Sequence, residues 1–148
     1  MLGRLKWATK VVIIGGEMVG CEVADVLSEQ GGKEITIVRR ETKLLTKTRV
    51  STLRAVLLHR LESRGVKFEL GVTYKEADEK GLVVIDREGN EKLLEADTVV
   101  LAAGAQPDTK LLYELKGKVP EVFSVGDAVE PRQILHAIHE GFKVAYSL

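Results

Sequence analysis

The chain has 148 residues, a length that suits one domain and allows a sizeable hydrophobic core. Its 22 basic and 22 acidic residues cancel, so no net positive field favours binding to nucleic acid or to an anionic membrane. The apolar runs are too short to cross a bilayer, and a single cysteine, Cys21, excludes disulfide frameworks, C-x-x-C redox pairs and cysteine-based metal sites within this sequence. A cytoplasmic location is therefore expected.

The first predicted unit is a strand, a glycine turn, a helix and a second strand. Residues 10–16 read KVVIIGG, an apolar run that ends in glycine, as expected for a buried parallel strand. The positions that follow at helical spacing are Val19, Val23, Val26, Leu27 and Gln30. Gly31 and Gly32 predict the end of this helix, and residues 34–40, EITIVRR, predict the next strand. Together these elements form one βαβ unit.

A second helix and further strands are predicted downstream. Residues 50–64 show an amphipathic pattern that ends before Gly65, a residue typical of a helix C-terminus. The apolar positions of this helix are Leu53, Val56, Leu57 and Leu61. Residues 66–72 resume a strand, and residues 81–97 predict a β-hairpin whose turn lies in REGN. Residues 98–108, TVVLAAGAQPD, predict a buried strand that runs into a Gly/Pro loop.

The C-terminal part predicts a short helix at 111–117, an apolar strand at 121–127 and a final helix. The apolar positions of that final helix are Ile134, Ala137, Ile138 and Val144. His136 and His139 lie three positions apart, but without a third ligand they indicate a helix face rather than a metal site. The alternation of strands and helices predicts an α/β fold, a Rossmann-like doubly wound parallel sheet with a β-hairpin crossover.

The glycine turn after the first strand is the main candidate site. Gly15, position 17 and Gly20 have the spacing G-x-G-x-x-G, in the strand–turn–helix context that a dinucleotide site requires. Gly15 permits a tight turn, and Gly20 lets the helix pack against the sheet. The N–H groups of the first helical turn would then hold a pyrophosphate. The alternative is an ordinary βα turn that uses glycine for packing only.

Glu17 stands where the middle glycine of the motif is expected. Two unit charges about 6 Å apart repel by roughly 0.7 to 3 kcal/mol, which would weaken pyrophosphate binding by about three- to a hundredfold. The carboxylate could instead cap the helix N-terminus and stabilise the empty turn. We therefore expect a formed nucleotide turn with impaired affinity, which Glu17→Gly should improve.

The second predicted strand ends in Arg39 and Arg40, and Arg39 lies 19 positions after Gly20. An acid at this place would accept hydrogen bonds from the adenosine ribose, whereas an arginine would meet the 2′-phosphate of NADP. Since the nearest acid, Glu41, lies beyond the arginines, NADPH is favoured over NADH. The alternative is two solvated arginines on a loop.

Two later segments carry a resemblance to a known family. VVLAAGAQPD, with Ala103 where threonine is commoner, and VFSVGDA resemble the paired signatures of flavoproteins in which an NAD(P)H domain is inserted into an FAD domain. GGEMVGCE together with GDAVEPRQILHAIHEG resembles the C-terminal part of the NADH:flavin oxidoreductase group, which includes 2,4-dienoyl-CoA reductase, 2-enoate reductase and trimethylamine dehydrogenase. The resemblance implies a nucleotide domain at 1–104 and part of an FAD domain at 105–148.

The resemblance also implies roles for individual residues. The residues that would bind NAD(P)H or line the crossing between the cofactors are Gly15, Gly16, Glu17, Met18, Gly20, Ala103 and Gly104. Gly126 and Asp127 would meet the FAD ribityl and phosphate region. Glu22 matches an acid near the nicotinamide, although a polar residue on the first helix is an equal alternative. Cys21, packed at the helix start, is expected to be inert.

The departures from the family pattern predict a fragment or excised domain. The glycine turn of the FAD domain, the FMN-carrying barrel and the cysteines of an iron–sulfur cluster have no counterpart in this sequence. The implied function is to bind the nicotinamide nucleotide for a larger enzyme that passes hydride to flavin and reduces an enoyl-CoA or enoate. The isolated chain should show negligible turnover. One alternative is a non-catalytic nucleotide sensor with a degraded turn. Another is that the larger enzyme is a ferredoxin or dithiol reductase.

The expected partners are the missing N-terminal FAD and barrel portions of the parent chain. Residues 121–148 carry an apolar face whose usual sheet is missing from this sequence. Because exposed apolar faces and unpaired strand edges associate, a homodimer through this segment, or a disordered tail, is expected.

Overall fold

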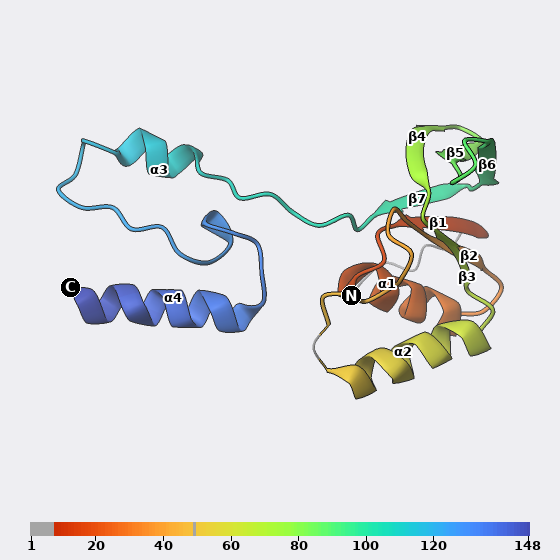
Figure 1. Cartoon of the computed structure of the whole chain (residues 1–148), viewed down its shortest axis with the longest axis horizontal. Helices are drawn as coiled ribbons and strands as arrows, with labels where there is room; N and C mark the ends of the chain where they lie inside the picture. The colour runs from red at the N-terminus through yellow and green to blue at the C-terminus, as the bar shows by residue number, and fades with distance from the viewer. Residues whose placement is uncertain (1–7, 49) are drawn as a thin grey trace. The chain divides into compact units, whose positions relative to one another are not determined.

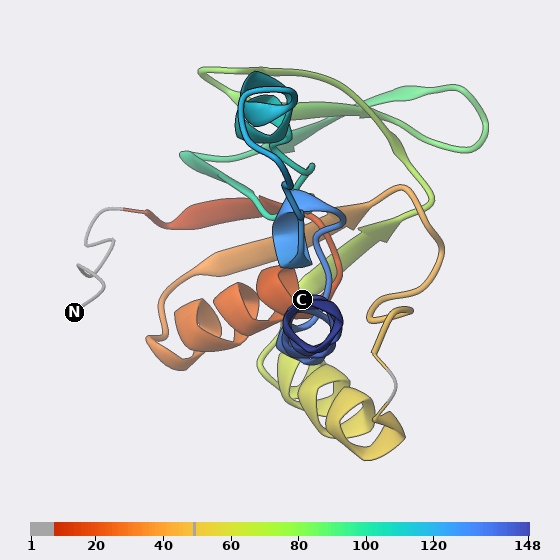
Figure 2. The same ribbon diagram turned by 90° about the vertical axis from the view of Figure 1, so that its left-hand side faces the viewer.

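The computed structural model describes residues 8–48 and 50–148, and the chain divides into two compact units. The first unit ends at Ala103, and the second is Gly104–Leu148. Within the first unit, two helices lie on one face of a parallel sheet and a small antiparallel sheet lies on the other (Figures 1 and 2).

The parallel sheet of the first unit has the strand order β3-β2-β1-β7. Its strands are β1 (Lys10–Ile14), β2 (Glu34–Arg39), β3 (Lys67–Leu70) and β7 (Thr98–Leu101), each parallel to its neighbours. β1 is flanked on both edges and buried on both faces, which explains why it is apolar from Val11 onwards. The predicted α/β fold with a Rossmann-like parallel sheet is confirmed.

Helices α1 (Met18–Glu29) and α2 (Ser51–Ser63) form the core on one side of this sheet. The fully or nearly buried side chains of the two helices are Cys21, Ala24, Leu27, Leu57 and Leu61, which pack with Val11, Ile13, Ile35 and Ile37 of the strands. Both helices end as predicted, at glycines of positive φ, Gly31 and Gly65.

The predicted buried faces of these helices are partly wrong. Val19 and Val26 of α1 are 62% and 51% exposed, because the small residues around Gly20 and Ala24 face the sheet and allow close approach. Leu53 and Val56 of α2 are also exposed, since that helix meets the core through a single stripe. The hydrophobic spacing predicted where the helices lie in the sequence, but it assigned some exposed positions to the face that packs on the sheet.

An antiparallel sheet covers the other face of the parallel sheet. It consists of β4 (Thr73–Asp78), β5 (Gly81–Ile85) and β6 (Glu91–Glu95). The predicted hairpin is β5–β6, and its turn is closed by the Asn90 N–H, which donates to the Asp86 carboxylate at 2.8 Å. The second core lies between the sheets and contains Val12, Ile14, Val38, Leu82, Val84 and Leu94.

The second unit contains α3 (Lys110–Leu115), the short 3₁₀ helix η1 (Gly126–Ala128) and α4 (Ile134–Ser147). The predicted helices at 111–117 and from Ile134 are confirmed, but the predicted strand at 121–127 is wrong. An isolated extended segment cannot pair its backbone groups, and no strand of this unit lies beside it. The apolar side chains of α4 remain exposed, including Ile134, Ile138 and Phe142.

None of the helices in the described ranges is both long enough and apolar enough to span a membrane.

Candidate functional site

The candidate site is the glycine turn that follows β1, at the carboxyl end of an inner strand of the parallel sheet. In doubly wound sheets, ligands bind outside these carboxyl ends. Gly15 has φ +123°, a conformation that side chains rarely adopt, and a Cβ there would lie 2.2 Å from the Ala102 carbonyl oxygen. The Gly15 N–H donates to the carbonyl of Val38 at 2.9 Å. The turn therefore requires glycine at this position.

Two further glycines are required by close packing. A Cβ at Gly20 would lie 1.9 Å from the Gly15 carbonyl oxygen, so α1 begins directly against the turn. A Cβ at Gly16 would lie 2.3 Å from Leu44 Cδ2 and 2.8 Å from Arg39 Cδ. These contacts give each glycine a packing role. Binding of a pyrophosphate would instead depend on the first N–H groups of α1. These groups have no acceptor within the helix and lie at the positive end of its dipole.

Glu17 occupies the N-cap position of α1, but its side chain does not cap the helix. Its carboxylate accepts hydrogen bonds from Arg39 Nη2 at 2.6 Å, from Thr46 Oγ1 at 2.7 Å, and from the N–H groups of Thr46 and Lys47 at 3.2 Å each. The capping hypothesis is therefore wrong, because an arginine and three other donors compete for the same oxygens. Burial opposes ionisation of Glu17, but the hydrogen bonds from Thr46 and Arg39 outweigh it and lower the pKa of this carboxyl group.

Arg39 ends β2, and its side chain is only 5% exposed. Besides Glu17, its guanidinium donates to the Gly16 carbonyl and to Thr46 Oγ1 at 2.8 Å each, and to Glu41 Oε2 at 2.7 Å. Burial disfavours the charge, but the carboxylates of Glu17 and Glu41 outweigh it and raise the arginine pKa. The alternative of a solvated loop arginine is wrong for Arg39. Its predicted role as a phosphate ligand stays a prediction and requires these ion pairs to open.

Arg40 differs from its neighbour because its side chain is exposed. The guanidinium carbon lies 5.9 Å from the centroid of the Tyr74 ring, a loose cation–π contact. Arg40 is thus the solvent-exposed arginine at this strand end.

The loop after β2 folds back onto the glycine turn, a feature that the sequence reasoning missed. Leu44 and Leu45 are 4% and 0% exposed, and the Leu45 N–H donates to the Gly16 carbonyl at 2.8 Å. Leu45 has φ +55°, so the chain accepts backbone strain to make this contact. Two adjacent leucines in an otherwise polar linker were the available signal.

The remaining predicted site residues fall into three places. Ala103 follows β7, and its backbone nitrogen would lie 3.1 Å from a Cβ at Gly15, whereas Gly104 begins the second unit. Glu22 is exposed on α1. Gly126 and Asp127 belong to the second unit, where the Gly126 N–H donates to Glu140 Oε2 at 2.7 Å. The turn thus gathers Gly15, Gly16, Glu17, Met18, Gly20, Arg39 and Ala103 within the first unit.

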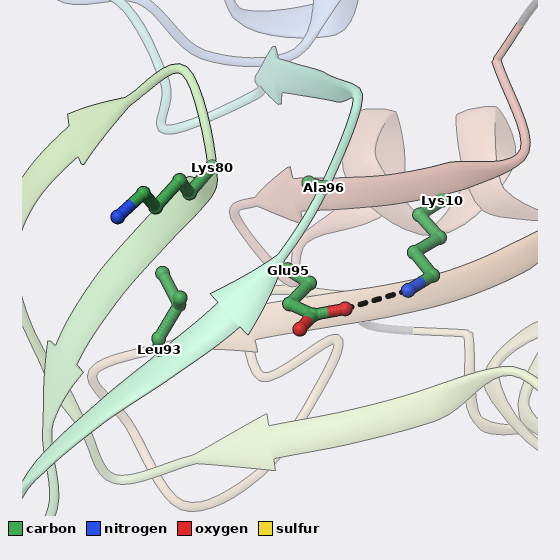
Figure 3. A pocket seen from close by; sticks show the side chains of 5 residues that line it. All are labelled: Lys10, Lys80, Leu93, Glu95 and Ala96. Carbon is green, nitrogen blue, oxygen red and sulfur yellow. Dashed lines mark hydrogen bonds and ion pairs between the residues drawn. The ribbon is translucent and has the colours of Figure 1, made fainter.

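A surface hollow lies elsewhere on the first unit (Figure 3). It is lined by Lys10, Lys80, Leu93, Glu95 and Ala96. Lys10 begins β1, whereas Gly15 follows the end of that strand, so the hollow lies at the amino end of the parallel sheet. An exposed ion pair of 2.6 Å between Lys10 and Glu95 borders it. This position does not favour a nucleotide, because open parallel sheets bind ligands at the opposite end.

The histidines and the cysteine take no part in the glycine-turn ion pairs described above. Among the described residues, no group of three histidine, cysteine, aspartate or glutamate side chains could hold a metal ion. Cys21 is fully buried, and burial raises the pKa of its thiol to about 12. The sulfur lies 3.7 Å from the Gly16 carbonyl oxygen.

Comparisons with known proteins agree with this geometry. A protein family described as "Pyridine nucleotide-disulphide oxidoreductase" matches residues 2–141. The chain is 30% identical to "Metal reductase" of Desulforamulus reducens over 98% of this chain and 26% of that protein. It is 31% identical to "NADH oxidase" of Thermoanaerobacter brockii over 94% of this chain and 21% of that protein. Among solved structures, a 2-naphthoyl-CoA reductase in complex with 2-naphthoyl-CoA is 28% identical, with a TM-score of 0.81 over 94% of this chain and 21% of that one.

The chain therefore spans only about a fifth to a quarter of the length of these relatives. The family match covers the glycine turn and residues 104–141 of the second unit.

Proposed function

The chain belongs to the pyridine nucleotide-disulphide oxidoreductase family, and from that premise we propose that it is the nicotinamide-nucleotide-binding part of a larger flavin-dependent oxidoreductase. The family implies NAD(P)H and FAD as cofactors. When both are bound, the nicotinamide supplies hydride and the flavin accepts it. The observation that carries the proposal is the glycine turn at the carboxyl end of β1, closed tightly by Gly15 and Gly20.

The residues of the turn suit a pyrophosphate. The amino end of α1 offers N–H groups without helical acceptors and a positive dipole end. Glu17 does not point its carboxylate at these groups, since Arg39, Thr46 and Lys47 hold it toward the loop. The positive charge of Arg39 offsets the negative charge of Glu17. The repulsion that the sequence predicts is therefore reduced, and the turn itself positions the dinucleotide.

The choice between NADPH and NADH is a further part of the proposal. The sequence favours NADPH because two arginines, Arg39 and Arg40, end β2. Since Arg39 is buried and Arg40 is exposed, we propose that Arg40 provides this preference. Arg40→Gln should weaken NADPH binding by about three- to tenfold while leaving NADH binding unchanged, because only NADPH carries the 2′-phosphate. Lys80→Gln removes the same unit charge outside the site and serves as the control.

For the substrate of the whole protein, we propose an enoyl thioester or enoate. The named 2-naphthoyl-CoA reductase supports an acyl-CoA acceptor, and the finer assignment to the 2,4-dienoyl-CoA reductase branch belongs to the same proposal. Relatives of similar identity carry the names metal reductase and NADH oxidase. The relatives share this segment, but their names indicate different electron acceptors. This difference supports a substrate site that lies outside this chain.

We propose that the second unit contributes Gly126 and Asp127 to an FAD domain completed by other parts of a longer protein. Its exposed apolar side chains support a contact with those parts or, for the chain alone, with a second copy. The largest exposed ones are Leu111, Tyr113, Phe123, Ile134, Leu135, Ile138, Phe142, Tyr146 and Leu148. Light scattering on the chain distinguishes a dimer from a monomer, and a monomer at high concentration would contradict self-association.

Calorimetric titration with NADH, NADPH and FAD in turn tests the proposed function. Nicotinamide nucleotides should bind with one site per chain, and FAD alone should not support NAD(P)H oxidation above a no-protein control. Failure of both nicotinamide nucleotides to bind would contradict the proposal.

A further inference from the structure

Arg39 lies at the place where Rossmann-like domains distinguish NADPH from NADH, yet it does not face solvent. It is the last residue of β2, and the residues at this strand end approach the adenosine ribose. Its side chain lies under the glycine turn, where its Cδ would lie 2.8 Å from a Cβ at Gly16. The Arg39 guanidinium could bind a 2′-phosphate by its chemistry and its place in the fold, but it is buried.

The contacts of Arg39 show which partner keeps it there. A phosphate is bound through the terminal nitrogens of arginine, often by two parallel hydrogen bonds. Nη2 is engaged by Glu17 and Thr46, and Nη1 by the Gly16 carbonyl. Glu41 takes only Nε, and its side chain is 61% exposed against 28% for Glu17. Glu17 is therefore the partner that both neutralises the buried charge and occupies the phosphate-binding end of the guanidinium.

We infer that Glu17 is a specificity-determining residue, which keeps Arg39 from the 2′-phosphate of NADPH by pairing with it inside the turn. The inference rests on the proposed binding of a nicotinamide nucleotide at this turn. Its consequence is that the residue at the middle glycine position decides whether Arg39 adds to the NADPH preference that Arg40 is proposed to supply. Without the Glu17 carboxylate, Arg39 keeps its charge, loses its closest counter-ion and becomes available to a phosphate beside it.

The test compares NADH and NADPH affinities, by calorimetry, for wild type, Glu17→Gln and Glu17→Gly. Both substitutions should raise the NADPH-to-NADH affinity ratio by at least about fivefold, the size of one modest charge-assisted hydrogen bond. Glu41→Gln is the matched control, since it removes the other carboxylate partner but leaves Nη2 engaged; it should change the ratio by less than about twofold. Far-UV circular dichroism confirms that each variant is folded.

Two further variants separate Arg39 from a general charge effect. The double variant Glu17→Gln with Arg39→Met should return the ratio to the wild-type value. Arg39→Met alone leaves the Glu17 carboxylate unpaired beside the turn, so it should weaken both nucleotides, and NADPH more than NADH because NADPH carries the extra phosphate. It is therefore compared with the double variant, in which both charges are absent.

Each remaining outcome contradicts the inference. An unchanged ratio in folded Glu17 variants that still bind NADH would contradict it and leave the proposed function intact. A raised ratio that persists in the double variant would attribute the effect to lost negative charge, not to Arg39. A fall of the ratio by more than about fivefold below the wild-type value in the double variant would show that the wild-type arginine already binds the phosphate. Absence of binding of both nucleotides to wild type would contradict the proposed function, and this inference with it.

Discussion

Glu17 Oε1 and Arg39 Nη2 lie 2.6 Å apart, joining the start of α1 to the end of β2 across 22 positions of sequence. The pair lies beneath a turn whose usual occupant at position 17 is a glycine. Because the loop residues Thr46 and Lys47 bond the same carboxylate, one acidic side chain connects three segments around the site.

The Glu17–Arg39 pair should stabilise the fold. Glu17→Gln or Arg39→Met should each lower the free energy of unfolding by about 1 to 3 kcal/mol, since each leaves a partly or fully buried group without its main partner. The double variant should lose less than the sum, with a coupling energy on the order of 1 kcal/mol. Urea denaturation followed by circular dichroism measures the cycle, and additive losses would show that the two residues do not interact.

Two helical glycines should respond to alanine in opposite directions. Gly20→Ala should destabilise the first unit by about 2 kcal/mol or more, because the new Cβ would overlap the Gly15 carbonyl oxygen. Gly141 lies in α4 with nothing within 4 Å of an added Cβ. Gly141→Ala should therefore raise helix stability by about 0.5 to 1 kcal/mol. Thermal unfolding curves of the two variants make the comparison, and equal tolerance at both positions would refute the tight turn.

Asp97 should make stability depend on pH in the acid range. Its carboxylate accepts from the N–H groups of Lys10 and Thr9 at 3.0 and 2.7 Å, and these hydrogen bonds lower its pKa to about 2 from an ordinary 3.8. A lowered pKa in the folded state stabilises the fold above pH 3.8, and the effect is lost as the pH falls from 3.8 through about 2.

Asp97→Asn should accordingly be less stable than wild type near neutral pH, and the difference should shrink toward pH 2. Urea midpoints for both proteins between pH 6 and pH 2 give this difference directly. A difference that stays constant over the range would show that the charge of Asp97 plays no part.

Cys21 should be unreactive in the folded chain. Its sulfur is inaccessible and its thiol has a pKa of about 12, so almost no thiolate exists at neutral pH. A disulfide reagent should modify one thiol per chain at the unfolding rate in buffer and immediately in denaturant. Rapid labelling of the native chain would place Cys21 outside the core and reopen thiol chemistry for this protein.

The sequence was sufficient to predict the elements that local rules determine. The apolar strand from Val11, the glycine turn and the β5–β6 hairpin each combine a hydrophobic period with a residue that ends it. The strand predicted at 121–127 failed because pairing is not local, and the described second unit supplies no strand beside it.

The ion pair at the site depended on side-chain direction, which the sequence reasoning did not use. Ile35, Ile37 and Arg39 alternate along β2 and all are buried. The period of two therefore places Arg39 on the same face as the two isoleucines, the face that α1 covers. The sequence could not predict that Glu17 pairs with Arg39 on this face, because the contact also depends on the fold of the loop that carries Thr46.

The most direct test of nucleotide binding at the turn is an amide NMR titration of the chain with NADH. Saturable shifts are expected at the N–H groups of Gly16, Met18, Val19 and Gly20, with the Lys10–Glu95 hollow unaffected. Shifts confined to that hollow, or none at the turn at saturating nucleotide, would contradict binding at the turn.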